Sequence, residues 1–176
     1  MNKKIVTYLE QRRPLMALQG ARRAGKTYTI MQWLLLNAYN DGDVIQVASM
    51  TNEQGRRGAY EDGQTILRSW GAFGNYFEVG KSPRRIVCKR NNTTSGREGV
   101  IEFSSYDDPE TAKGAACDWV FMNEANKFTR QQYLDLAANA RKGVICDFNP
   151  NRHFWIEDEL TAKDVLKCSW QDNAKH

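Results

Sequence analysis

Two kinds of ligating or cross-linking side chain are scarce in this sequence. Among 176 residues there are only two histidines, and the four cysteines lie about thirty residues apart with no closely spaced pair. Zinc sites require Cys or His pairs at short spacing, and disulfide-stapled domains are short and rich in cysteine. The sequence therefore argues against both classes and predicts free thiols in a reducing compartment, at Cys88, Cys117, Cys146 and Cys168.

Long apolar runs are missing as well. The N-terminal segment MNKKIVTYLEQRRP has no apolar core of signal-peptide length, and no run elsewhere approaches the roughly 18 residues that cross a bilayer. We therefore expect a soluble, intracellular protein with no membrane partner. With 41% hydrophobic and 26% charged residues, a chain of this length suits a single domain.

Positive charge is present in modest excess and occurs in pairs. The formal net charge is +4, and adjacent cations stand at 12–13, 22–23, 56–57, 84–85 and 89–90. Paired cations can form a stripe that faces nucleic-acid phosphates, but solvated surface charges are the commoner explanation for such pairs. The charge pattern permits nucleic-acid binding without demonstrating it.

Apolar runs rich in β-branched residues alternate with segments of helical periodicity. This alternation is typical of an α/β fold in which helices cover both faces of a mostly parallel central sheet, giving three layers. We predict strands at 14–20, 43–49, 84–89, 99–105, 118–125, 143–150 and 164–170, and helices at 26–39, 52–70, 129–140 and 154–162. The strands at 84–89 and 99–105 flank NNTTSGREG, a sequence that suits a hairpin or a mobile tip.

Two of the predicted helices carry local signals. Gly55, Gly58 and Gly63 lower the helix propensity of the segment 52–70. Thr129, with Gln132 three residues later, predicts a capping box at the start of the helix 129–140.

The strongest motif is a glycine-rich loop with the pattern G-x-x-x-x-G-K-T between the first predicted strand and helix. Its residues are Gly20, Ala21, Arg22, Arg23, Ala24, Gly25, Lys26 and Thr27. In such a P-loop, main-chain N–H groups and the helix N-terminus surround a β-phosphate, the lysine neutralises β/γ oxygens, and the Thr hydroxyl ligates Mg²⁺. The motif predicts a bound nucleotide with Mg²⁺ and a P-loop NTPase.

Two arginines inside the loop are a further feature. A guanidinium so close to the phosphates can stabilise the γ-phosphate within the same chain. Arg22 and Arg23 are both candidates for this role, and the sequence leaves open which of them faces solvent.

Hydrolysis also requires a positioned water. In WVFMNEA four apolar residues precede Asn123 and Glu124, where P-loop ATPases carry acidic residues for the metal and for the base. Glu124 is the predicted catalytic carboxylate. Asn123 can hold a metal-bound water but lacks the usual Asp charge, so either Thr27 and the phosphates suffice for Mg²⁺, or Asp118 or another acid assists.

Taken together, these motifs resemble the ATPase domain of the large terminase subunit of tailed bacteriophages, the motor that packs DNA into procapsids. The resemblance covers nearly the whole chain. It rests on the arginine-bearing P-loop, on SSYDDPETAKGAACDWVFMNEANKF with its E-A-N strand end, on DFNPNRHFWI, which is similar to the family's N-P and H-W-I segment, and on CSWQDN, which is similar to T-Y-x-D-N.

The resemblance implies that the nucleotide is ATP, bound with Mg²⁺, and that the fold is a P-loop NTPase of the RecA-like, ASCE type. It also implies roles for further residues. It makes Asn149 a coupling residue that senses the γ-phosphate, although an Asn-Pro pair alone is more often a turn. It also makes Gln11 a candidate adenine contact, for which a solvated side chain is an equal alternative. Candidates for a cation that acts on a neighbouring subunit's ATP are Arg56, Arg57, Arg130 and Lys113.

The family usually adds a metal-dependent nuclease domain. Since this chain stops at His176, we expect residues 1–176 to be one ATPase domain, isolated or a fragment, without cleavage activity. The consecutive acids Glu157, Asp158 and Glu159 point in different directions on a helix and suit a solvated face better than a two-metal cluster.

The implied partners are double-stranded DNA, a portal protein, a small terminase subunit and other copies in a ring on the procapsid, in the host cytoplasm. Two other functions stay open from the sequence. One is a small P-loop kinase, and the other is a nucleic-acid-binding module with a degenerate nucleotide site.

Overall fold

The structure is a computed structural model in which eight strands form one sheet. It describes residues 1–21, 23–90, 93–107, 115–149, 153–161, 163–169 and 171. The strands are β1 (Leu15–Gly20), β2 (Val44–Ser49), β3 (Phe77–Lys81), β4 (Arg84–Cys88), β5 (Gly99–Ser105), β6 (Cys117–Met122), β7 (Ala140–Phe148) and β8 (Val165–Cys168). Their order across the sheet is β3-β4-β5-β2-β6-β7-β1-β8.

Six neighbouring strands of this sheet run parallel. The parallel pairs are β5 with β2, β2 with β6, β6 with β7, β7 with β1 and β1 with β8. At the other edge, β4 pairs antiparallel with both β5 and β3, so the predicted hairpin between β4 and β5 is confirmed. Because helices cover both faces of parallel strands, the sequences of such strands are continuous apolar runs. Every residue of β6 is buried.

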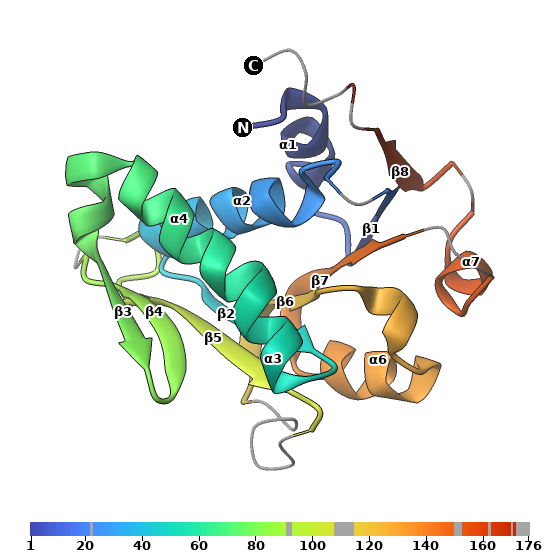
Figure 1. Cartoon of the computed structure of the whole chain (residues 1–176). Coiled ribbons are helices and arrows are strands. Elements are labelled where there is room, and N and C mark those ends of the chain that lie inside the picture. The colour runs from blue at the N-terminus through green and yellow to red at the C-terminus, as the bar shows by residue number, and fades with distance from the viewer. Residues whose placement is uncertain are drawn as a thin grey trace.

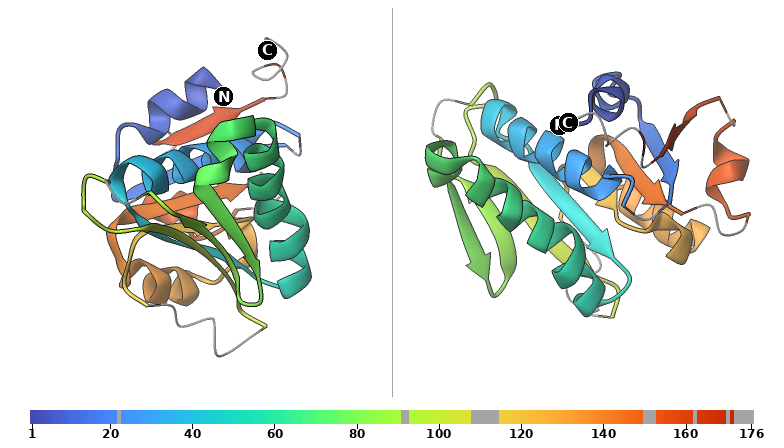
Figure 2. Two further views of the ribbon diagram at one scale, coloured as in Figure 1. Left: turned by 90° about the vertical axis from the view of Figure 1, so that its left-hand side faces the viewer. Right: turned by 45° about the horizontal axis from the view of Figure 1, so that its top comes forward.

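Helices cover both faces and complete three layers (Figures 1 and 2). On one face α2 (Lys26–Asp41) lies beside α4 (Glu61–Ser69), and α1 (Lys3–Leu9) packs on α2. On the other face lie the short helix η3 (Ala125–Lys127), α6 (Arg130–Ala137) and α7 (Ile156–Glu159). Two apolar cores therefore sandwich the sheet, and the predicted α/β fold class is confirmed.

The helix predicted at 52–70 is present but interrupted. It consists of α3 (Asn52–Gly55), a π-helical turn η1 (Arg56–Tyr60) with non-helical dihedrals at Gly58, and then α4. A Cβ on Gly55 would lie 2.5 Å from Ser49 Oγ, and one on Gly58 would lie 3.0 Å from Asn123 Nδ2. These glycines let the helix approach the carboxyl ends of β2 and β6.

Other element boundaries differ from the predictions. α1 was not predicted, although its buried Ile5, Tyr8 and Leu9 follow helical spacing and Asn2 caps it through bonds to the Lys4 and Ile5 N–H groups. β3 and the 3-10 helix before it, η2 (Gly71–Tyr76), were also missed. The predicted capping box at Thr129 is confirmed, but α6 ends at Ala137 because β7 already begins at Ala140.

All four cysteines are free and buried. Within the described ranges, no helix combines the length and the apolar character needed to cross a membrane.

Candidate nucleotide-binding site

The glycine-rich loop joins the carboxyl end of β1 to the first turn of α2. Gly25 precedes the helix with a left-handed backbone, φ 72°, and Lys26 is only 6% exposed. Lys26 Nζ donates to the Gly20 carbonyl at 2.6 Å and to the Ala21 carbonyl at 3.2 Å. It also lies 3.5 Å from Asn149 Oδ1, at the end of β7. The lysine ammonium thus stands inside the loop, between two strand ends.

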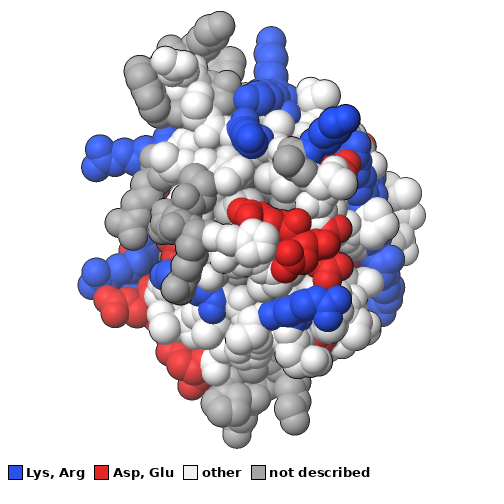
Figure 3. Space-filling view, turned by 90° about the vertical axis from the view of Figure 1, so that its right-hand side faces the viewer, with Lys and Arg blue, Asp and Glu red and all other residues white. Residues whose placement is uncertain are grey.

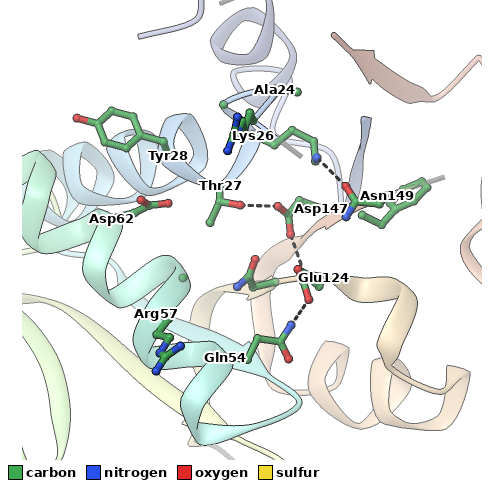
Figure 4. A pocket seen from close by; sticks show the side chains of 15 residues that line it. Ala24, Lys26, Thr27, Tyr28, Gln54, Arg57, Asp62, Glu124, Asp147 and Asn149 are labelled. Atoms are coloured by element: carbon green, nitrogen blue, oxygen red, sulfur yellow. Dashed lines mark hydrogen bonds between the residues drawn. The ribbon is translucent and has the colours of Figure 1, made fainter. Parts of the chain in front are cut away.

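A cavity of about 670 Å³ opens beside this loop (Figure 4). Four segments line it: the loop and first turn of α2 at 23–28, the α3–α4 segment, the end of β6 and the end of β7. Besides residues 23–28, the lining residues are Gln54, Arg57, Gly58, Asp62, Asn123, Glu124, Asp147, Phe148 and Asn149. The volume lies in the range typical of small-molecule sites.

Glu124 follows β6 directly and carries an unusual backbone, with φ 57° and ψ 54°. Its Oε2 accepts a short hydrogen bond from Gln54 Nε2 and pairs with Lys127 Nζ at 2.5 Å. Positive φ is uncommon outside glycine and recurs at functional sites. Among the described residues it occurs at three non-glycine positions, of which Arg23 and Glu124 line the cavity.

Asp147, near the end of β7, is a site residue that the sequence reasoning missed. Thr27 Oγ1 donates to Asp147 Oδ2 at 2.7 Å, and the Glu124 N–H donates to Asp147 Oδ1 at 2.8 Å. The residue is 3% exposed, and burial raises the pKa of its carboxyl group. Its only signal in the sequence is its place at the end of an apolar strand, two residues before Asn149.

Asn123 lies in the cavity and is 4% exposed. Asp118, the acid named above as a possible helper for Mg²⁺, does not lie there. It stands at the opposite end of β6, where it accepts from the Val44 N–H at 2.9 Å and from Arg97 at 3.1 Å. Because most of β6 lies between Asp118 and Asn123, the structure does not support Asp118 as the helper. Of the open alternatives it favours another acid, Asp147, which contacts Thr27.

Comparisons with known proteins bear on this arrangement. No protein-family model and no curated protein sequence matches the chain. Solved structures do match: the large terminase of a thermophilic bacteriophage has a TM-score of 0.71 and 18% identity, over 99% of this chain and 47% of that one. The same terminase has been solved with ATP-gamma-S.

Two other phage proteins match as well. The large terminase of bacteriophage HK97 has a TM-score of 0.71 and 14% identity over 94% of this chain and 38% of that one. The N-terminal domain of the DNA packaging ATPase of bacteriophage phi29 has a TM-score of 0.60 and 14% identity, over 93% of each chain. This chain has the fold of a phage terminase ATPase domain. It spans less than half the length of the two large terminases named here.

Within the terminase ATPase fold, the cavity carries one more carboxylate. Asp62 projects from α4 toward Thr27, next to Tyr28 (Figure 4). Partial burial raises its pKa to about 6, with smaller contributions from the negative charges of Asp147 and Glu61. No sequence motif pointed to Asp62. The π-helical turn before α4 decides which side of α4 faces the cavity, and local sequence spacing does not predict that turn.

The predicted candidates for a trans-acting cation fall in different places. Arg57 lines the cavity and pairs with Glu53 at 3.1 Å, and Arg56 precedes it in the π-helical turn. Arg130 lies on α6 and pairs with Glu159 at 2.7 Å, away from the cavity lining. Arg22 and Lys113 lie outside the described residues.

Gln11 does not line the cavity. It is exposed in the turn after α1, where its N–H bonds to the Tyr8 carbonyl at 3.2 Å. This turn precedes β1, whereas the P-loop follows that strand. An adenine contact by Gln11 stays a prediction.

Acidic side chains gather on the face of the molecule that carries α7, beside several cations (Figure 3). Glu157 and Asp158 contact His153, and Glu159 pairs with Arg130. The hydrogen bond that the Glu157 carboxylate accepts from His153 raises the pKa of the imidazole. In the part of the chain that the structure describes, no group of three or more His, Cys, Asp or Glu side chains is arranged to hold a metal ion.

Proposed function

We propose that this chain is the ATPase motor domain of a phage DNA-packaging terminase, which hydrolyses ATP to move double-stranded DNA. The observation that carries the proposal is convergence at one cavity. Lys26 and Thr27 come from the β1–α2 loop, Glu124 from the end of β6 and Asn149 from the end of β7. The solved structure of a similar fold with ATP-gamma-S supports a nucleotide as the ligand.

Each group has a role that its position allows. Residues 20–27 surround the β-phosphate through main-chain N–H groups, and Lys26 neutralises β/γ oxygens. Thr27 Oγ1 is the ligand that this chain offers to Mg²⁺, with Asn123 placed to contact a metal-bound water. Mg²⁺ supplies charge neutralisation for the phosphates. Glu124 accepts the proton of the attacking water, and Asn149, 3.5 Å from Lys26 Nζ, senses the γ-phosphate.

The charges that line the cavity support a metal–nucleotide ligand. The described residues that line the cavity include three cations and three carboxylates. The cations are Arg23, Lys26 and Arg57, and the carboxylates are Asp62, Glu124 and Asp147. A triphosphate entering this balanced site needs additional positive charge, because buried uncompensated charge is costly. We propose Mg²⁺ and a cation from a neighbouring subunit in a ring as its sources, with Arg22 as a further candidate within the chain.

The partners and location follow from the same proposal. Residues 1–176 act as one ATPase domain, since all eight strands, β1 to β8, belong to a single sheet. The domain works in the host cytoplasm on double-stranded DNA, with a portal protein and a small terminase subunit. Metal-dependent DNA cleavage is not among the activities proposed for these residues.

Two variants test the catalytic assignment. Glu124→Gln should lower kcat by at least about a hundredfold, because the amide cannot accept the proton, while ATP affinity stays within severalfold of wild type. Lys26→Ala should impair both turnover and affinity. Steady-state phosphate release and calorimetric ATP binding in Mg²⁺ measure the two quantities.

The same measurements separate the alternatives. Unchanged turnover in Glu124→Gln would rule out Glu124 as the base. ATP consumption that depends on a small phosphoacceptor would indicate a kinase. Tight DNA binding without any Mg²⁺-dependent ATP binding would indicate a nucleic-acid-binding module.

A further inference from the structure

We propose that Asp147, on the strand between the P-loop strand and the Glu124 strand, is the carboxylate that positions Thr27 for Mg²⁺ and balances the metal's charge. In this role it replaces the charge that Asn123 lacks. The inference rests on the proposed nucleotide-binding function and adds a residue to it.

The hydrogen bond to Thr27 is the first support. A hydroxyl group has one proton and two lone pairs. With the proton of Thr27 Oγ1 donated to Asp147 Oδ2 at 2.7 Å, the oxygen's lone pairs remain for a cation. Asp147 is thereby a positioning residue, which acts on the metal through Thr27.

The second support is how rigidly Asp147 is held. Its other oxygen accepts the Glu124 N–H at 2.8 Å, and its side chain is 3% exposed. β7 pairs with β1 on one side and with β6 on the other. Leu18 of β1 is the residue paired with Asp147. One buried carboxylate thus joins the P-loop hydroxyl to the turn that carries the proposed base.

The third support is the environment of Asn123. Its amide is neutral, and its Nδ2 lies where a Cβ on Gly58 would come within 3.0 Å, so the α3–α4 segment packs closely on it. Asp147 has the charge that the metal requires and the direct contact with Thr27. Outer groups of this kind typically change metal affinity by about 10–100-fold when they are removed.

The test compares nucleotide and metal binding in wild type, Asp147→Asn and Asp147→Ser. ADP affinity is measured by calorimetry in excess Mg²⁺ and in EDTA, and Mn²⁺ binding to the ADP complex is measured by electron paramagnetic resonance. We expect both variants to bind ADP in EDTA as wild type does and to lose about 10–100-fold in Mn²⁺ affinity. Asp118→Asn, which removes a buried carboxylate at the opposite end of β6 and outside the cavity lining, is the matched control and should keep the Mn²⁺ affinity of wild type.

A double-mutant cycle with Thr27→Val adds a readout that a structural role would not change. If Asp147 acts through Thr27, adding Asp147→Asn to Thr27→Val should cost less than about twofold more in Mn²⁺ affinity. Wild-type Mn²⁺ affinity in both Asp147 variants would overturn the inference, and so would an equal loss of ADP affinity with and without metal. Failure of wild type to bind ADP under either condition would instead overturn the proposed function itself.

Discussion

At the scale of single residues, the cavity is organised by carboxylates in different environments. Glu124 is held by an amide and an ammonium group, Asp147 by a hydroxyl and a main-chain N–H, and Asp62 is half-buried on α4. Burial raises the pKa of Asp147 against the opposing effect of its two hydrogen-bond donors, and burial also favours the neutral form of Asp62, which the structure shows without such donors among the described contacts. Asp62 therefore responds to pH differently from an ordinary aspartate.

This difference predicts a pH-dependent stability. The pKa of Asp62 is about 6 in the folded protein and 3.8 ordinarily, so the folded state holds the proton more tightly. The stability that this proton contributes is present at pH below 3.8 and is lost as the pH rises through 6. Asp62→Asn should therefore increase the free energy of unfolding more at pH 8 than at pH 5. The difference between the two increases should be roughly 1 kcal/mol after allowing for solvent screening. Urea unfolding of both proteins at the two pH values measures the effect, and parallel pH profiles would contradict it.

Residue identity along the chain pointed to only part of this site. Lys26, Thr27, Glu124 and Asn149 belong to motifs with fixed local spacing, and the structure brings all four to one cavity. Asp147 and Asp62 acquire their places through strand order and helix rotation, which local spacing does not encode.

At the scale of elements, the segment from α3 to α4 acts as one wall of the site. It provides Gln54, Arg57 and Asp62, and its glycines set how closely it approaches the sheet. The sequence indicated these glycines only as a loss of helix propensity. Their packing role depends on the neighbours that they meet, Ser49 and Asn123, which lie on other elements.

Substitution of Gly55 tests this packing. Gly55→Ala should destabilise the fold by about 1–3 kcal/mol, because the new Cβ would meet Ser49 Oγ at 2.5 Å while Ser49 is held by hydrogen bonds to the Thr51 and Ser104 carbonyls. Urea unfolding measures the loss. Addition of Ser49→Ala, which removes the clashing atom, should recover part of the stability. If Gly55→Ala alone were neutral or stabilising, the close approach would not constrain the helix.

The elements themselves were largely predictable. Seven of the eight strands and the helices α2, α3–α4, α6 and α7 were expected, since apolar runs and helical periodicity are local signals. β3 was missed because its residues, FEVGK, are mostly exposed and become a strand only by pairing with β4. α1 was missed because seven residues give too short a window for periodicity to be distinctive.

At the scale of the whole molecule, the parallel sheet brings the ends of β1, β6 and β7 to one edge, where the cavity lies. The proposed DNA translocation would in addition need a surface that contacts backbone phosphates. Several of the paired cations are engaged within the chain, including Arg13 with Asp164 and Lys89 with Glu78. The net charge of +4 therefore suits the proposed DNA contact if that contact is weak and independent of sequence.

Salt dependence tests the proposed DNA contact. Binding to two duplexes of unrelated sequence should be equally tight and should weaken linearly on a plot of log affinity against log salt concentration. Fluorescence anisotropy with labelled duplexes measures both properties. A strong preference for one duplex, or affinity that is insensitive to salt, would contradict a contact made through backbone phosphates.

The most direct test of the whole account is a crystal structure with Mg²⁺ and a non-hydrolysable ATP analogue. We predict that the β-phosphate is surrounded by the N–H groups of residues 20–27, that Thr27 is a metal ligand, and that the Glu124 carboxylate faces the γ-phosphate. A nucleotide bound elsewhere, or Glu124 turned away from a correctly bound nucleotide, would contradict the proposed motor function.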